Sequence, residues 1–315
     1  MQRLIVRRLV SAVPTLLVVT FLIYALLLLI PGRDPVNLLL GERSDPEIIK
    51  YYRKELRLDD PIPVQYVRWL GGVLVLNFGR SLRTNERVAV ELGRRFIVTL
   101  ELAAGSLLVA LVIAVPIGIY SAARPNSLGD NVGTVVAVAG AALPSFWLGI
   151  MLIYMFAVNL GWLPTQGYVK FFEDPLDNLR HMLLPVIVNG TVSAASVARQ
   201  TRSAMLEVLR QDYIRTARSK GLAEQLVLLR HALRNALIPV VTVLGLTTAT
   251  LLGGTVITEW IFRLPGLGQF AVQSALVHDV PAIQGTLVVF GATVLVVNLV
   301  VDILYGFLDP RIRYT

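Results

Sequence analysis

Three carboxylates stand at the ends of long apolar stretches, where an ionisable group needs a partner or water. Glu101 begins one stretch, Glu259 ends another, and Asp302 lies near the end of the last one. We expect Glu101 and Glu259 to lie at a membrane interface, where water could solvate both without any special function. We expect Asp302 to form a structural ion pair with Arg311 or Arg313. No convergent set of acids and bases accompanies them, so their spacing does not indicate catalysis.

The other residues that could do chemistry give no stronger signal. His181, His231 and His278 are scattered without the spacing of a zinc site. No Gly-x-x-x-x-Gly-Lys loop is present to bind nucleotide phosphates, so any ATP would be bound by another chain. The sequence has 0 Cys, which removes disulfides and thiolate metal sites. We therefore expect no catalytic residue, cofactor or metal on this chain.

The composition places the chain in a membrane. Hydrophobic residues make up 55% and charged residues 16%, and the mean hydropathy is +0.66. A helix that crosses a bilayer needs about 20 mostly apolar residues. Six stretches qualify, so the predicted fold class is an all-α integral membrane protein with six transmembrane helices. These stretches are residues 9–30, 102–123, 131–160, 182–198, 237–258 and 280–301.

The third stretch is long enough to hold two spans, because no charge interrupts it between Asn131 and Val169. Proline is tolerated inside membrane helices, and Pro144 has no strong turn cluster beside it. We therefore predict one kinked span, followed by a turn in which Trp162 lies at the membrane interface.

The basic residues predict the orientation, since Lys and Arg near span ends are retained in the cytoplasm. They precede the first stretch, follow the second and fourth, and end the chain. Six crossings place all of these on one side, so both termini are predicted to be cytoplasmic.

The segment 31–96 is predicted to lie outside, because long segments of mixed charge translocate largely regardless of charge. Its pattern indicates helices, among them one within 45–58. Such a segment could bind an external partner or only cover the ends of the spans. The chain is thereby divided into a first helix with its basic start (1–30), an external segment (31–96) and a transmembrane core (97–315).

The basic segment 199–236, between the fourth and fifth spans, contains a pattern typical of a short docking helix. Asp212 can cap its start, Arg218 and Lys220 lie near its negative end, and Gly221 supplies the left-handed residue that commonly ends a helix. Thr216 and Ala217 are small enough for a partner surface to approach closely. The alternative is an ordinary solvated basic loop.

A second helix is predicted directly after this one. Leu226, Leu229, Leu233 and Leu237 form a helix-period apolar stripe that ends at Pro239, where the next apolar stretch begins.

The fifth stretch is unusually rich in small and hydroxyl-bearing residues. It could line a pathway, or the same residues could serve tight helix packing. The turn-rich segment 262–270 that follows could dip back into the mouth as a gate. The candidate pathway or gate residues are Thr250, Gly253, Gly254, Thr258, Glu259, Pro265 and Gly266.

These motifs together resemble the permease subunits of ABC transporters, specifically the dipeptide/oligopeptide/nickel permease family, over nearly the whole chain. Residues 213–222 and 231–240 look like the coupling segment of that family, and 252–259 and 264–268 look like its fifth-span exit. Leu58-Asp-Asp-Pro61, Asn77-Phe-Gly-Arg80 and Asp309-Pro-Arg-Ile-Arg313 extend the resemblance toward both ends. The generic signature has Glu-Ala-Ala where this chain has Arg215-Thr216-Ala217, which is the usual form of the peptide branch.

The resemblance implies an inner-membrane importer subunit that works by alternating access. Its implied partners are a homologous second permease, two cytoplasmic ATPase subunits, an external solute-binding protein and membrane lipid, with no nucleic acid. The implied solutes are peptides, glutathione, nickel or oligosaccharides. The implied ATPase-coupling residues are Asp212, Arg215, Thr216, Ala217, Arg218, Lys220, Gly221 and Leu222.

Two other classes of protein compete with this interpretation. An ion-coupled secondary transporter would favour carboxylates in mid-span or broken helices in two matching halves, and neither is clear. A membrane enzyme would need the convergent acids, bases or metal ligands that the sequence lacks.

Overall fold

The computed structural model describes residues 2–29, 46–55 and 59–308. These residues form helices joined by turns, with one isolated antiparallel bridge between Arg80 and Arg87. The helices are α1 (Gln2–Leu29), α3 (Pro46–Glu55), α4 (Ile62–Leu74), α5 (Val88–Ala123), α6 (Leu128–Ala142), α7 (Ser145–Leu152), α8 (Pro175–Leu209), α9 (Asp212–Ser219), α10 (Glu224–Leu226), α11 (Leu233–Gly254), α12 (Val256–Ile261), α13 (Leu267–Leu276) and α14 (Val280–Leu308). Two π-helical turns, Ile153–Asn159 and Val227–Ala232, follow α7 and α10.

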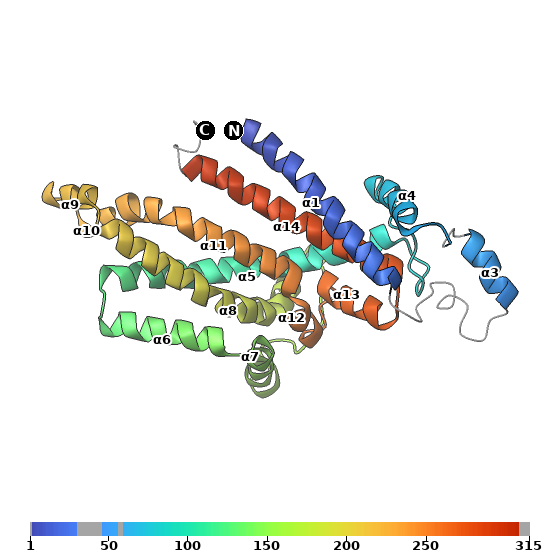
Figure 1. Cartoon of the computed structure of the whole chain (residues 1–315). Helices are drawn as coiled ribbons and strands as arrows, with labels where there is room; N and C mark the ends of the chain where they lie inside the picture. The colour runs from blue at the N-terminus through green and yellow to red at the C-terminus, as the bar shows by residue number, and fades with distance from the viewer. Residues whose placement is uncertain (1, 30–45, 56–58, 309–315) are drawn as a thin grey trace.

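The long helices run side by side as a bundle (Figure 1). Among the described residues, four helical segments are long and apolar enough to cross a membrane: Val88–Ala123, Pro175–Leu209, Glu224–Gly253 and Val280–Leu304. α1 packs along α14, and α4 packs on α1, where the hydroxyl groups of Thr20 and Tyr66 lie 2.8 Å apart. The all-α fold that the sequence predicts is therefore confirmed.

The most extensive helix interface in the bundle joins α5 to α8, and glycine makes it possible. A Cβ atom at Gly118 would lie 2.6 Å from the side chain of Thr201, and one at Gly190 would lie 2.6 Å from that of Val109. Because neither glycine has a side chain, the two backbones approach closely, as is common between membrane helices.

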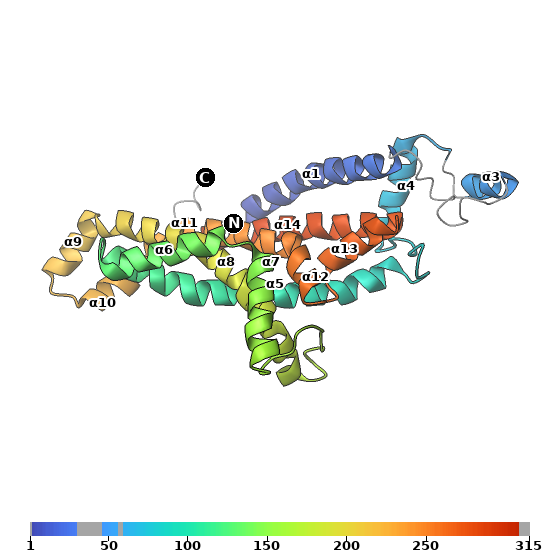
Figure 2. The same cartoon turned by 90° about the horizontal axis from the view of Figure 1, so that it is seen from below.

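The third predicted span differs from the structure. α6 ends at Ala142, and a separate helix begins at Ser145 and leaves the bundle at a large angle (Figure 2). Pro144 has no N–H to continue the ladder, and it holds Leu143 in an extended conformation with ψ 127°. With 15 residues, α6 is about 22 Å long, which is shorter than the hydrocarbon core of a bilayer. The stretch therefore breaks at Pro144 into two separate helices, where the sequence predicts one kinked helix.

The two ends of the bundle carry different elements. The start of α1, the end of α14 and helix α9 lie toward one end, and α4 and α13 lie toward the other (Figure 1). The helix predicted within 45–58 is present as α3. Three predictions fall wholly or partly outside the described residues. They concern Arg311 and Arg313, the expected ion-pair partners of Asp302, the first part of the external segment, and the terminal Asp-Pro-Arg-Ile-Arg motif.

Candidate coupling segment and gate

Helix α9 is anchored to the bundle by two side chains on one face. Ile214 is fully buried and Ala217 is only 7% exposed, and the two residues lie one turn apart. They pack into an apolar cluster with Met205 of α8 and with Val227 and Ala232 of the π-helical turn before α11. The docking helix is therefore joined mechanically to both neighbouring long helices.

The other face of α9 is exposed and polar, and most of the predicted coupling residues lie on it. The carboxylate of Asp212 accepts a 3.3 Å hydrogen bond from Arg215. Arg218 donates two hydrogen bonds, of 2.7 and 3.1 Å, to the carboxylate of Glu224. This pairing raises the pKa of the Arg218 guanidinium. The exposed positions are Asp212, Arg215, Thr216, Arg218, Lys220 and Gly221, and Leu222 is half-buried.

Gly221 ends this segment as the sequence predicts. Its φ is +75°, in the left-handed region, and its N–H donates to the carbonyl oxygen of Arg218 at 2.9 Å. A side chain at this position would meet open space, so the requirement for glycine comes from the backbone conformation alone.

Two expectations for α9 are wrong. The N-cap is Gln211, and Asp212 is the first helical residue, so its carboxylate does not cap the helix. Ala217 is turned inward, so it does not offer a small surface to a partner. Its size instead allows α9 to lie close to its own bundle.

The apolar stripe predicted after Gly221 is wrong in its first half and right in its second, since Leu233 and Leu237 are half-buried against the apolar cluster. Leu226 and Leu229 are exposed, whereas Val227, Ala232 and Ala236 are fully buried. The π-helical turn Val227–Ala232 adds a residue to the turn and rotates the buried face away from a regular 3.6-residue repeat. α11 then continues through Pro239 instead of ending there.

An ion pair between α6 and α8 lies near the same end of the bundle. Arg202 donates from Nε to Oδ1 and from Nη2 to Oδ2 of Asp130, both at 2.7 Å. The Asp130 side chain is buried, so this bidentate contact is partly shielded from water. The sequence analysis did not pair these residues, because they are 72 positions apart.

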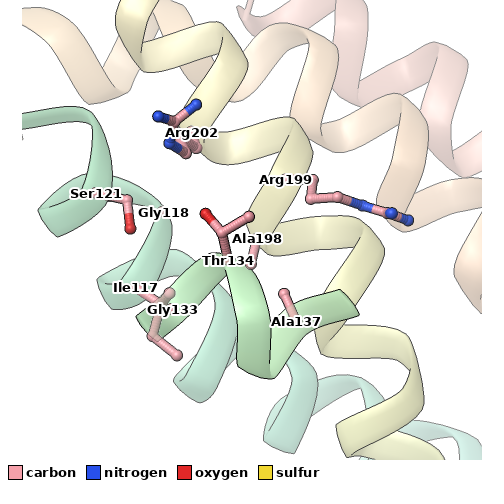
Figure 3. A pocket seen from close by; sticks show the side chains of 9 residues that line it. All are labelled: Ile117, Gly118, Ser121, Gly133, Thr134, Ala137, Ala198, Arg199 and Arg202. Carbon is pink, nitrogen blue, oxygen red and sulfur yellow. The ribbon is translucent and has the colours of Figure 1, made fainter. Parts of the chain in front are cut away.

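A small pocket adjoins Arg202 between α5, α6 and α8 (Figure 3). Gly118 and Gly133 form part of its wall, and Ser121 and Thr134 contribute hydroxyl groups. Its volume is about 20 Å³, which is about the space of one water molecule. It is therefore a packing feature and is too small for a solute.

Glu259 is fully buried, which overturns the expectation that water solvates it at an interface. Its Oε1 accepts hydrogen bonds from the hydroxyl groups of Thr99 at 2.8 Å and Thr255 at 2.9 Å. Its Oε2 accepts one from the backbone N–H of Gln269 at 2.8 Å. No Lys, Arg or His of the described residues forms an ion pair with it, so three neutral donors satisfy the carboxylate.

Gly266 lets the chain close over this carboxylate. A Cβ atom on Gly266 would lie 2.3 Å from Cδ of Glu259, which is far inside the van der Waals contact distance of two carbon atoms. One residue later, the N–H of Leu267 donates to the Thr99 hydroxyl at 2.9 Å. The turn between α12 and α13 is therefore fixed to α5 through Thr99 and Glu259.

The seven gate candidates do not form one site, because some lie around Glu259 and the others lie on α11. Thr258, Glu259 and Gly266 are buried together, and Pro265 is half-buried beside them. Thr250 is exposed on α11, and its hydroxyl bonds to the carbonyl oxygen of Leu246 in its own helix at 2.9 Å. In the last turns of the same helix, Gly253 faces open space, and Gly254 is the final residue of α11.

Asn189 is a buried polar residue that the sequence analysis missed. Its Oδ1 accepts a 2.7 Å hydrogen bond from Thr258, and its Nδ2 has no partner among the described residues. An unsatisfied buried donor is rare and calls for an explanation. An asparagine within an apolar stretch is the signal that could have identified it.

Glu101, another of the three carboxylates, also has defined surroundings. Glu101 is half-buried and accepts hydrogen bonds from the Tyr168 hydroxyl at 3.0 Å and from Nδ2 of Asn178 at 3.3 Å. Burial and the neighbouring Glu101 carboxylate raise the pKa of Tyr168, which lies in the loop before α8. Glu101 therefore holds this loop to α5 instead of being simply solvated. Within the described part of the chain, no group of three or more acidic or histidine side chains could hold a metal ion.

The structure is a bundle of long apolar helices that carries a solvent-exposed basic helix, α9, at one end, which is an arrangement that suits a membrane component of a transport system. Family models agree: residues 114–314 match the binding-protein-dependent transport system inner membrane component, and residues 1–103 match the N-terminal part of such a membrane component. The chain belongs to this family.

The chain also matches several relatives along their whole length. The chain is 42% identical over 314 residues to a putative peptide transport system permease protein of Brucella abortus, with 100% of both chains covered. It is 43% identical over 335 residues to a di/tripeptide transport system permease protein of Pseudomonas aeruginosa, covering 100% of this chain and 99% of the relative. It is 41% identical over 314 residues to a glutathione transport system permease protein of Salmonella paratyphi A, with 100% of both chains covered.

Among solved structures, the chain is similar in fold to a chain of the inward-facing MetNI methionine ABC transporter. The TM-score is 0.57 at 20% identity, over 69% of this chain and 96% of that chain. This chain is therefore a permease subunit of an ABC importer and not an enzyme, since separate subunits of such importers hydrolyse ATP.

Proposed function

We propose that this permease translocates short peptides, from dipeptides to oligopeptides, that a binding protein delivers. The main support is that relatives matched along their whole length are named for the transport of peptides, di- and tripeptides, and the tripeptide glutathione. The test is uptake of labelled dipeptide, tripeptide, glutathione and nickel by the complete complex in proteoliposomes with ATP inside. ATP-dependent uptake of nickel without uptake of any peptide would contradict the proposal.

The proposed complex contains a homologous second permease, two ATPase subunits and an external solute-binding protein. The family description, which names a binding-protein-dependent system, supports the last of these partners. Purification of the tagged chain from its own membranes, with identification of the co-purified proteins, tests the composition.

The proposed topology has six crossings with both termini in the cytoplasm. It is supported by the position of the start of α1 and the end of α14 toward the end of the bundle that carries α9 (Figure 1). α5 ends at that end of the bundle, and α8 begins away from it, so α6 and α7 with their connections make the third crossing. The segment 31–96 then lies outside, and α9 lies inside.

The proposed coupling surface is the exposed face of α9, with Asp212, Arg215, Thr216, Arg218 and Lys220 directed toward an ATPase subunit. Movement of this helix would be transmitted through Ile214 and Ala217, since both are packed against α8 and the start of α11. Packed interfaces of this kind shift between discrete arrangements, which suits a lever in alternating access.

The proposed gate is the α12–α13 hairpin held by Glu259. Its neighbour Thr258 bonds to Asn189, whose Nδ2 is buried without a partner, so it would meet a peptide carbonyl only after the hairpin opens. Conversion between open and closed forms would require the carboxylate to exchange its bonds to Thr99 and Gln269.

A further inference from the structure

An open groove of about 500 Å³ lies between the end of α4 and the start of α5. One part of its lining is apolar and includes Val75, Leu76 and Val90. Arg80 and Arg87 contribute the basic part, and an antiparallel bridge holds these two residues opposite each other. Both arginines are exposed, so the groove presents two cations beside an apolar wall.

The two cations are not neutralised by neighbouring carboxylates. Glu86 pairs with Arg94 at 3.7 Å, and Glu91 pairs with Arg95 at 2.8 Å. Arg80 donates to the backbone carbonyl oxygen of Asn85 at 2.8 Å, which leaves its charge uncompensated. Neither Arg80 nor Arg87 forms an ion pair within the described ranges, so the groove suits an anion.

The apolar wall is built with unusual backbone geometry. Leu76 has a φ of +57°, in a region that side chains other than glycine and asparagine seldom enter. The turn is held by a hydrogen bond from the N–H of Asn77 to the carbonyl oxygen of Gly72 at 2.8 Å. The Leu76 side chain is 72% exposed as a result. Backbone strain of this kind clusters at functional sites.

The groove lies at the level where α14 begins its apolar stretch. A Cβ atom on Gly285 of α14 would lie 2.9 Å from Val88 and Leu92 and 3.4 Å from Phe78, which line or adjoin the groove. Further along α5, Ile97 is also exposed, about two helical turns after Val90. Apolar side chains are therefore exposed both at the groove and two turns further along α5, with Gly93 and Arg94 between them.

We propose that this groove binds one anionic phospholipid. The phosphate lies between Arg80 and Arg87, and an acyl chain follows Leu76, Val90 and Ile97. The two uncompensated cations select a negative headgroup, and they lie just before α5, a helix long and apolar enough to cross a membrane. The apolar wall distinguishes a lipid from a free anion, because only a lipid has hydrocarbon to bury there.

Native mass spectrometry of the purified full chain tests the proposal with phosphatidylglycerol and phosphatidylcholine. The double variant Arg80→Ala/Arg87→Ala should bind phosphatidylglycerol about 25-fold more weakly, from about fivefold for each arginine near an anionic lipid. Its affinity for phosphatidylcholine should change little. Arg83→Ala, in the same turn but outside the groove lining, is the matched control and should bind like the unchanged chain. Unchanged selectivity in the double variant would overturn the site.

Photocrosslinking in native membranes gives a second readout that does not depend on the arginine variants folding. A photoreactive benzoylphenylalanine in place of Leu76 should acquire the mass of a phospholipid. A cross-link to a protein instead, or none, would overturn the proposal. Displacement of phosphatidylglycerol by equimolar inorganic phosphate would overturn it too, since the groove would then recognise phosphate alone.

Discussion

The hydroxyl group of Thr99 on α5 donates a 2.8 Å hydrogen bond to the carboxylate of Glu259 on α12, 160 residues further along the chain. The same hydroxyl oxygen accepts a hydrogen bond from the N–H of Leu267 at 2.9 Å. One threonine thus joins a long helix to both sides of the α12–α13 turn. Because the carboxylate is buried, the removal of any of its donors leaves part of a charge unsatisfied.

Thr99→Ala should destabilise this hairpin. It removes one donor to Glu259 and the acceptor of Leu267, and an unsatisfied buried group costs about 1–3 kcal/mol. Thermal unfolding of the purified chain in detergent measures the change. Thr250→Ala is the matched control, because its hydroxyl bonds only within its own helix and is exposed. Equal stability of the two variants would show that the Thr99 link contributes nothing.

Gly266→Ala should displace the Glu259 carboxylate by steric overlap alone. The backbone of Gly266, with φ −91° and ψ 179°, suits alanine, so the clash at 2.3 Å is the only penalty. We expect a loss of about 1–3 kcal/mol of stability, as in other overpacked cores. Gly253→Ala is the control, since a Cβ atom there meets open space and helix propensity favours alanine. A stable, transport-competent Gly266→Ala variant would contradict the proposed gate.

The sequence predicts local features well because their causes are local. The left-handed conformation of Gly221 could be predicted because glycine is the residue that most commonly ends a helix in this way. The long helices could be predicted from the length of the apolar stretches alone. The surroundings of Glu259 could not be predicted, because its donors come from α5 and α13. The buried face after Gly221 was missed because a π-helical turn shifts the register between Val227 and Ala236.

Asp130→Asn should weaken the attachment of α6 to α8. The substitution replaces a bidentate, charge-assisted contact, and hydrogen bonds to charged groups contribute about 1.5–3 kcal/mol. The free energy of unfolding should fall by that amount. Asp212→Asn is the matched control, since the Asp212–Arg215 pair is exposed and such pairs contribute about 0–1 kcal/mol. Similar small effects for both variants would show that burial adds nothing to the first pair.

The proposed topology can be tested with single cysteines, because the chain contains 0 Cys. Arg53→Cys on α3 should react with a membrane-impermeant maleimide added to intact cells. Ser219→Cys, at the end of α9, should react only after the membrane is permeabilised, since α9 is proposed to lie inside. Labelling of both from the same face would contradict six crossings.

Gly221→Val should uncouple transport from ATP hydrolysis. A left-handed conformation costs an L-residue about 1–2 kcal/mol, and β-branching adds to this, so α9 would end differently and its exposed face would turn. Gly221→Asn is the matched control, because asparagine tolerates this conformation. Solute-stimulated ATP hydrolysis and co-purified ATPase, both normalised to permease abundance, measure the effect.

A pair of tryptophan substitutions separates the two faces of the same helix. Thr216→Trp adds bulk to the exposed face, so ATPase should be lost while the unfolding temperature of the isolated permease stays the same. Ala217→Trp adds bulk to the face packed against Met205 and Val227, so it should lower that temperature as well as the ATPase content. Normal ATPase content in Gly221→Val and Thr216→Trp would remove α9 from the coupling role and leave it a solvated basic helix.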